Sequence, residues 1–392
     1  MREMILILLS ILSLALLGGG IRPPAEFREH TIATELKGGY QVVAEDLNRD
    51  GKIDLIAVAS GMKDLLWFEN PGWQPHVLAS GLSRMINAAA TDTDGDGIPE
   101  VIVAHEFAND PARSAGIVSL LTHGADVRAP WSIREIDRLT TSHRLRWADF
   151  EGTGHKVLVN APLAGALSRT PDYRDKVPLV FYRPDLSWKR EVISDQLEGV
   201  LHGIFITDWD RDGRDDLLAA SFLGIDLFQL DKKKGWIRTS LAAGNPDPWP
   251  KCGSSEVAVG KLGSEKFVCS IEPWHGNQVV VYRVPGGRLS GGALQSSRLV
   301  IDDSLSDGHT LLVADFNRDG RDEIVAGFRG KGQSVYLYTA DPNGKWTRQS
   351  LDDGGMAAAG CVIADLNGDG RPDVACIGSA TANLKWYENV VK

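Results

Sequence analysis

One unit recurs along the chain at intervals of about 50 residues, and this repeat limits the possible folds more than any other feature. Each unit has a small apolar strand, an acidic loop and a second apolar strand, as in VVAEDLNRDGKIDLIAV at Val42 and LLVADFNRDGRDEIVAG at Leu311. The copies align on one loop position, which is Asp46, Asp92, Asp149, Asp208, Lys261, Asp315 and Asp365. A repeat of this length, made of short strands and turns, is typical of the blades of a β-propeller.

Two more strands complete each unit. The third is aromatic and alternating, as in LKWYEN at Leu384, and the fourth often follows a Trp, as in WTRQSL at Trp346. A strand of the fourth type also occurs before the first unit, at His30, whereas the last unit has none before Lys392. We therefore predict an all-β, seven-bladed propeller of four-stranded antiparallel blades, closed by the N-terminal strand completing the last blade.

The first 20 residues have the features of a signal peptide: a short n-region with Arg2, an apolar run from Met4 to Leu17, and three small residues ending at Gly20. The alternative is an uncleaved anchor. We expect residues 21–392 to form one extracytoplasmic propeller, periplasmic or secreted, that is free of the membrane after cleavage. The net charge of −10 argues against nucleic-acid binding, which would call for a basic face.

Two of the four cysteines, Cys361 and Cys376, lie opposite each other if the last repeat forms the expected hairpin. In an exported protein they are either a cross-strand disulfide or two buried thiols, because the sequence does not give the cross-strand geometry.

Five of the loops follow the pattern D-x-[DN]-x-D-G-x-x-[DE], with carboxylates or amides at alternate positions around a Gly that permits a sharp bend. This pattern is similar to the first half of an EF-hand loop and predicts Ca²⁺ ligands. The alternative is a tight Asx-type turn without metal. The predicted ligands are Asp46, Asn48, Asp50, Asp54; Asp92, Asp94, Asp96, Glu100; Asp208, Asp210, Asp212, Asp216; Asp315, Asn317, Asp319, Glu323; and Asp365, Asn367, Asp369, Asp373. The loops at Asp149 and Lys261 have lost ligands and are expected to be empty.

Three histidines occupy one position of the repeat. His143, His202 and His309 each precede the loop position of their unit by six residues, which places them at the face opposite the acidic loops, at the mouth of the central channel. The same position holds other residues in the remaining units: Tyr40, Ile86, Ser255 and Ala359. The histidines are therefore not a requirement of the repeat.

The second strands of the units should end on this same face, and their ends carry further polar residues, which are His105, Glu272, His275 and Arg329. Neutral imidazoles from several strands suit a catalytic Zn²⁺, which needs three protein ligands and one open position. We predict zinc ligands among His143, His202, His275 and His309. The alternative is a set of hydrogen-bonded structural histidines.

The acidic repeat resembles the FG-GAP/VCBS family of propeller repeats over nearly all of the chain after residue 20. The segments LHGIFITDWDRDGRDDLLAASFLGI, GSSEVAVG, SIEPWHGNQVVVYR and GHTLLVADFNRDGRDEIVAGFRG also look similar to the propeller domain of the aldos-2-ulose dehydratase/isomerase family. The resemblance implies a zinc site in a propeller cleft that acts on keto-sugars such as 1,5-anhydrofructose. It places His202, His275 and His309 in that site, together with His143, Glu272 and Arg329.

The fungal enzyme of that family has cupin and lectin-like domains after its propeller, and this sequence lacks them. The resemblance therefore implies a dehydratase or β-eliminase without the isomerase activity, unless a separate cupin-type partner protein supplies it. The expected substrate is a small carbohydrate with a carbonyl group, such as an aldosulose or a 3-keto-glycoside.

In this reading Zn²⁺ polarises the ketone, and a base takes the proton on the adjacent carbon. The candidate bases are His105, a histidine of the cluster that does not bind the metal, and Glu272, and Arg329 would hold the enolate or a ring hydroxyl. The predicted substrate-binding residues are Trp274, Tyr173, Arg84 and Arg144.

Two other functions fit the same sequence. A polysaccharide lyase would abstract a proton next to a uronate carboxylate, but it should have a long basic groove, and few Lys or Arg fall on the channel face. A non-catalytic FG-GAP module would bind glycans or proteins, and its histidines would hold no transition metal.

Overall fold

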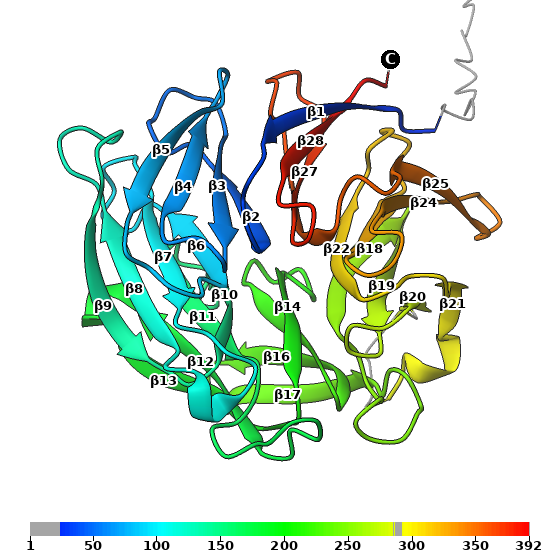
Figure 1. Cartoon of the computed structure of the whole chain (residues 1–392). Coiled ribbons are helices and arrows are strands. Elements are labelled where there is room, and N and C mark those ends of the chain that lie inside the picture. The colour runs from blue at the N-terminus through cyan, green and yellow to red at the C-terminus, as the bar shows by residue number, and fades with distance from the viewer. Residues whose placement is uncertain (1–23, 285, 287–291, 392) are drawn as a thin grey trace, which may run out of the picture.

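Alternating apolar residues form strands that pair into seven four-stranded antiparallel sheets in the described part of the chain. The computed structural model describes residues 24–284, 286 and 292–391, so the predicted signal peptide lies outside the described residues. Figure 1 shows the sheets arranged as blades around a central axis. The predicted seven-bladed, all-β propeller is confirmed.

Each blade contributes four consecutive strands except the last. Blades 1 to 6 are β2–β5, β6–β9, β10–β13, β14–β17, β18–β21 and β22–β25, with the first strand of each innermost. The strand bounds are β1 (Phe27–Ala33), β2 (Gly39–Glu45), β3 (Asp54–Ala59), β4 (Leu65–Glu69), β5 (Gln74–Ala79), β6 (Asn87–Thr91), β7 (Glu100–His105), β8 (Ile117–Thr122), β9 (Ser132–Arg138), β10 (Ser142–Ala148), β11 (Val157–Pro162), β12 (Lys176–Arg183), β13 (Lys189–Glu198), β14 (Leu201–Thr207), β15 (Asp216–Ser221), β16 (Gly224–Asp231), β17 (Gly235–Ala242), β18 (Glu256–Leu262), β19 (Glu265–Glu272), β20 (Gln278–Arg283), β21 (Leu299–Asp302), β22 (Gly308–Ala314), β23 (Glu323–Phe328), β24 (Val335–Ala340), β25 (Trp346–Asp352), β26 (Ala358–Ala364), β27 (Asp373–Gly378) and β28 (Leu384–Asn389). Three 3-10 turns accompany them: η1 (Pro111–Arg113), η2 (Pro184–Leu186) and η3 (Gln295–Ser297).

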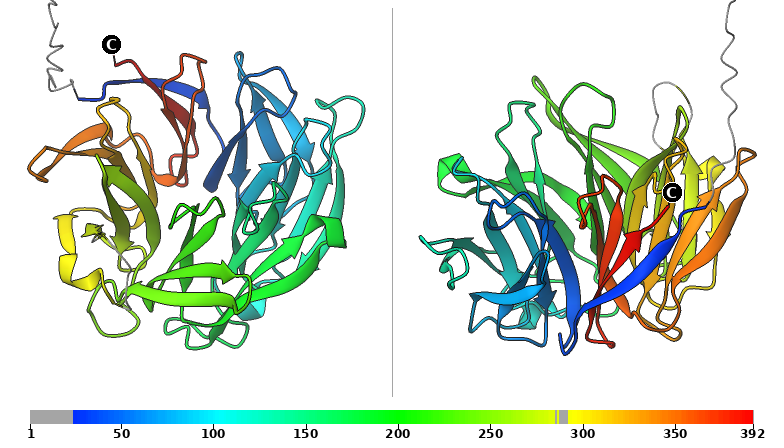
Figure 2. Two further views of the ribbon diagram at one scale, coloured as in Figure 1. Left: turned by 180° about the vertical axis from the view of Figure 1, so that it is seen from behind. Right: turned by 90° about the horizontal axis from the view of Figure 1, so that it is seen from above.

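The last blade joins the two ends of the chain. Its strand order is β26-β27-β28-β1, with Phe27 opposite Asn389 and His30 opposite Trp386. In both views of Figure 2 the N-terminal strand, in blue, lies along the C-terminal strands, in red. The predicted closure is therefore confirmed, and it removes the open edge that β28 would otherwise present.

Separate apolar clusters fill the interfaces between neighbouring blades. One packs Trp67 of blade 1 against Val103 of blade 2, and another packs Phe181 of blade 3 against Phe228 of blade 4. The interface between the last and first blades is filled in the same way, by Ile377 and Trp386 against Leu55 and Phe68. Both faces of each sheet are thus buried, which explains the nearly continuous apolar second strands.

Cys361 and Cys376 are directly opposite in the β26–β27 pair and form a disulfide. Of the two alternatives left by the sequence, the disulfide is the one the structure shows. Among the described residues no helix is long and apolar enough to cross a membrane.

Removing this disulfide should lower the free energy of unfolding by about 3 kcal/mol, because the crosslink closes a loop of 15 residues. The measurement is chemical denaturation of the wild type and a Cys361→Ala/Cys376→Ala variant, each with and without reductant. Reductant should destabilise only the wild type. Equal stability of all four samples would show that the crosslink contributes nothing.

Candidate functional site

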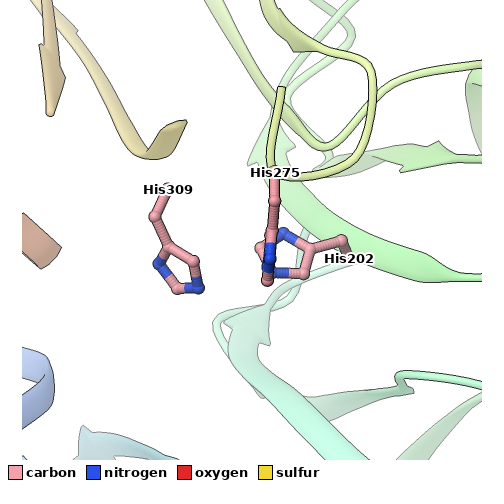
Figure 3. A group of neighbouring side chains, drawn as sticks. All are labelled: His202, His275 and His309. Carbon is pink, nitrogen blue, oxygen red and sulfur yellow. The ribbon is translucent and has the colours of Figure 1, made fainter. Parts of the chain in front are cut away.

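The histidine face of the propeller brings three imidazoles together from three blades. His202 lies on β14 of blade 4 and His309 on β22 of blade 6, and His275 lies in the loop after β19 of blade 5. One ring nitrogen of each lies within 4.8 Å of the others, and Figure 3 shows the three rings facing one another. We call His202, His275 and His309 the histidine triad.

The loop that carries His275 turns back on itself over a glycine. A Cβ on Gly276 would lie 2.2 Å from the carbonyl oxygen of Glu272, so no other residue fits there. His275 itself has a φ of 51°, in the left-handed region that is unfavourable for a side-chain-bearing residue. With this backbone conformation the His275 imidazole lies against that of His202, with ring centroids 4.9 Å apart.

The outer nitrogen of each triad imidazole has a hydrogen-bond partner. The Nδ1 of His202 lies 2.9 Å from Glu256 Oε1, and that of His275 lies 3.2 Å from Asp307 Oδ1. The Nδ1 of His309 bonds to the backbone carbonyl of Ala359. The acceptors at Nδ1 of His202 and His309 favour a proton there and leave the Nε2 lone pairs to face inward, an arrangement found around metal-bound histidines. His275 Nδ1 also lies 3.4 Å from Nη2 of Arg329, which can only donate.

The spacing of the inner nitrogens suits a tetrahedral metal. His202 Nε2 and His275 Nε2 lie 3.2 Å apart, whereas two Zn–N bonds of about 2.1 Å at a tetrahedral angle separate their nitrogens by about 3.4 Å. Burial, and then the nearby Arg329 and other histidines, lower the pKa of His309 well below its usual value, and burial lowers the pKa of His202 and His275 too. The triad is therefore neutral at neutral pH, the form that binds metal.

His143 lies beside the triad rather than in it. Its ring centroid is 5.0 Å from that of His202, and its Nε2 is hydrogen-bonded to the hydroxyl of Tyr40 at 2.8 Å. The same hydroxyl lies 3.2 Å from His309 Nε2. Tyr40 thus connects His143 to the triad. The sequence did carry a signal for Tyr40, because it occupies the repeat position of the three histidines.

Glu256 was missed by the sequence analysis. Its carboxylate pairs with Arg144 at 2.7 Å as well as with His202. Burial alone would raise the pKa of Glu256, but Arg144 and His202 outweigh it and lower the pKa. Glu256 therefore stays charged, and it orients His202 while Arg144 balances its charge. Arg144, predicted to bind substrate, has its guanidinium committed to this pair and lies 5.6 Å from the Tyr40 ring.

Two of the predicted bases, His105 and Glu272, do not lie with the triad. His105 ends β7, where its Nε2 is hydrogen-bonded to Ser119 on β8. Glu272 is fully buried and bonds to Tyr282, Ser254 and Arg298. Neither is in contact with a triad imidazole among the described residues. The reason is that both belong to second strands, whose side chains point into the blades and the interfaces between them rather than toward the axis.

The predicted substrate residues differ in accessibility. Trp274 is half-buried and stacks on His275 with centroids 4.6 Å apart, while Tyr173 is buried against the edge of Trp274. Tyr173 therefore supports Trp274 and offers no free face of its own. Arg329 pairs with Asp307 beside the triad, and Arg84 pairs with Glu106 at the rim. Arg84, Arg329 and Tyr40 all line a cavity of about 390 Å³ at the mouth of the channel.

Comparisons with known proteins show similarity to two groups of propeller sequences. Residues 115–284 match the family described as "Aldos-2-ulose dehydratase, beta-propeller domain", and residues 46–103 and 315–376 match FG-GAP-like repeats. The chain is a propeller that is similar, over these segments, to FG-GAP-like repeats and to the propeller domain of aldos-2-ulose dehydratase. His202 and His275 lie inside the first matched segment.

A curated relative is the aldos-2-ulose dehydratase of Phanerodontia chrysosporium, which is 27% identical over 308 residues. The match covers 72% of this chain but only 33% of the relative, so the chain corresponds to about a third of that enzyme. Solved structures of similar shape include the exotype rhamnogalacturonan lyase YesX (TM-score 0.48, 12% identity, 94% of this chain and 75% of that chain) and a protein of unknown function from Bacteroides thetaiotaomicron (TM-score 0.47, 10% identity, 93% and 76%). Likeness at this level carries no inference about activity.

The acidic loops lie at the opposite face and share one hydrogen-bond pattern. In each of the five loops the last carboxylate accepts a hydrogen bond from the backbone N–H of the residue that follows the first Asp. Leu47 donates to Asp54 in this way, and Phe316 donates to Glu323. The first Asp accepts the N–H of the loop Gly, as in Gly51 to Asp46. The loops thus contain the Asx-type turns of the alternative interpretation.

Two loops gather three carboxylates closely enough to hold a metal ion. They are Asp92, Asp94 and Asp96 of blade 2, and Asp208, Asp210 and Asp216 of blade 4, with oxygens within 4.8 Å of one another. Burial raises the pKa of the last carboxylate in several loops: Glu323 to about 8, Asp54 to about 7, and Asp216 and Asp373 to about 6.

These raised pKa values predict that calcium and pH act together on stability. Below the raised pKa the folded protein binds more protons than the unfolded chain, so stability is present at low pH and is lost as the pH rises through about 6 to 8. In EDTA the melting temperature should therefore fall between pH 5 and pH 8.5. Added Ca²⁺ should restore it more at pH 8.5, where the carboxylates are charged.

Thermal melts at the two pH values, with EDTA or with Ca²⁺, provide the measurement. A Glu323→Gln variant is the control, because it cannot titrate and should lose part of the pH dependence. Identical melts with EDTA and Ca²⁺ at both pH values would rule out calcium binding by the loops.

Proposed function

We propose that this protein is an extracytoplasmic, zinc-dependent dehydratase or β-eliminase that acts on small sugars bearing a carbonyl group. The observation that carries the proposal is the orientation of the histidine triad, whose Nδ1 atoms are engaged by Glu256, Asp307 and the Ala359 carbonyl. The similarity to the propeller domain of aldos-2-ulose dehydratase supports the same chemistry. We also propose that the acidic loops bind structural Ca²⁺.

His202, His275 and His309 would hold the Zn²⁺. When bound there, Zn²⁺ supplies a Lewis acid that polarises the sugar carbonyl and favours loss of a proton from the adjacent carbon. Trp274 borders the triad and offers an apolar surface to a sugar ring. Arg329, held by Asp307, supplies a positive charge for the oxygen on which negative charge develops.

The proton would leave to the pair formed by Tyr40 and His143. Tyr40 Oη lies 3.2 Å from His309 Nε2, and it is hydrogen-bonded to His143 Nε2 at 2.8 Å. Burial, and then Arg144, lower the pKa of His143 well below its usual value, which keeps its imidazole neutral at neutral pH. The C–H bond adjacent to the carbonyl breaks, and the β C–O bond then breaks with departure of a hydroxyl or alkoxyl group, which receives a proton to leave as water or an alcohol.

This assignment replaces His105 and Glu272, which hydrogen bonds hold away from the triad. The lyase alternative is less well supported, because Arg144 and Arg329 are both ion-paired and so do not form a basic groove. A cupin-type partner protein remains a proposal that follows from the relative's greater length.

Metal content is the most direct test of the zinc site. After extensive dialysis the wild type should retain about one equivalent of zinc, and a His202→Ala/His309→Ala variant should lose it, because one ligand does not hold the ion. A His105→Gln variant is the matched control, since His105 is also buried but lies outside the triad. Metal analysis by mass spectrometry, with circular dichroism to verify folding, gives the result. Zinc-free wild type, or zinc retained in the double variant, would contradict the site.

Replacement of Tyr40 tests the proton-transfer assignment. Tyr40→Phe should lower kcat for elimination from a keto-sugar about 10²- to 10⁴-fold, because general acid–base catalysis contributes about that much. Zinc content should be unchanged, since Tyr40 is not a ligand in this assignment. The comparison is with Tyr336→Phe, on the outer part of blade 6, which should behave as wild type. Full activity of Tyr40→Phe would place the base elsewhere.

A further inference from the structure

The central channel continues beyond the triad as a cavity of about 430 Å³. The innermost strands of the blades form its wall. Tyr40 and His309 line it on the side of the triad, and Glu45, Trp147 and Val313 line it closer to the acidic loops. Much of the wall between is aliphatic, with Ala, Val, Ile and Leu side chains from β6, β14, β22 and β26.

Four charged side chains line this cavity: Glu45, Arg144, Arg146 and Glu256. Arg144 and Glu256 form an ion pair at 2.7 Å and compensate each other. The charged neighbours that influence Glu45 are Lys156 and Asp46, which places it at the acidic-loop end of the channel. Within the described part of the chain Arg146 therefore has no ion-pair partner of its own, and Glu256, which is already paired with Arg144, attracts it only at longer range.

The contacts of Arg146 are all with neutral groups. Its Nη1 donates to Asn87 Oδ1 at 3.2 Å and to the Leu145 carbonyl at 2.7 Å. Among the described residues no carboxylate lies within ion-pairing distance of it. Burial, followed by repulsion from Arg144, lowers the pKa of Arg146 to about 10, so the side chain is still charged at neutral pH.

A charge without an ion-pair partner in such a place is costly, because protein surroundings solvate it less well than water does. Nε and Nη2 of Arg146 remain able to donate hydrogen bonds to a ligand. A guanidinium with these two donors free matches the two oxygens of a carboxylate or phosphate in a bidentate arrangement.

We propose that the central channel is a binding site for a small oxyanion, held by Arg146 and distinct from the histidine triad. The aliphatic wall around Arg146 favours an anion with an apolar body, which makes an organic carboxylate a better ligand than inorganic phosphate. The site does not depend on the proposed elimination reaction, since Arg146 has no part in the triad.

Calorimetric titrations with hexanoate and with inorganic phosphate test the proposal. The wild type should bind at least one of the two anions with saturation at one equivalent. A lower Kd for hexanoate than for phosphate would identify the ligand as an organic carboxylate. Arg146→Met should weaken that binding at least tenfold. The control is Arg138→Met, because Arg138 is exposed and pairs with Glu135 on an outer strand.

Asn87→Asp provides a second variant in case Arg146→Met does not fold. Its new carboxylate would lie against Arg146 and supply an ion-pair partner, and it removes no hydrogen bond, because Nδ2 of Asn87 has no partner. This variant should melt at a higher temperature than the wild type in low-salt buffer and should no longer bind the anion.

A His202→Ala/His275→Ala variant separates this site from the proposed zinc site, because it removes two of the three triad imidazoles and neither of them lines the cavity. It should bind the anion as the wild type does. Loss of anion binding in that variant, with binding retained in Arg146→Met, would place the anion on the triad and overturn the proposal. Absence of saturable binding in the wild type would overturn it as well.

Discussion

Closure of the ring is the constraint on which the rest of this structure depends. Each blade buries both faces of its sheet against its neighbours, so no blade can be removed without exposing two apolar clusters. The final interface forms only when β1 pairs with β28 and the last blade packs on the first. Because the ring is closed, the innermost strands are held at fixed positions around one axis, and side chains from distant blades meet there.

The candidate site is a consequence of that geometry. His202, His275 and His309 come from three different blades and touch only because the strands that carry them converge at the mouth of the channel. Glu256 and Asp307 then hold two of the imidazoles from outside. The blades supply a rigid frame, and the loops and strand ends supply the chemistry, so the repeat itself can remain the same while one face becomes functional.

Polar groups along the axis differ in how they are compensated. Glu256 joins Arg144 and His202 in one network, and each charge in it has a partner. Arg146, on the same strand as Arg144, faces the channel without one. The wall of the channel thus changes along the axis: it is polar next to the triad and largely aliphatic beyond it.

The sequence by itself determined the number of blades, the ring closure and the acidic loops, because these follow from a repeat of local strand and turn signals. It also placed His143, His202 and His309 on one face by counting within the repeat. It did not show that His143 lies outside the triad or that His105 and Glu272 lie away from it. It also did not show that Glu256 and Asp307 contact the triad. Those outcomes depend on which way each side chain points and on contacts between different strands and blades, such as that of Arg144 with Glu256. These contacts are set by tertiary packing. The sequence of a strand shows which side chains share a face, but it does not show which residues of other strands pack against that face.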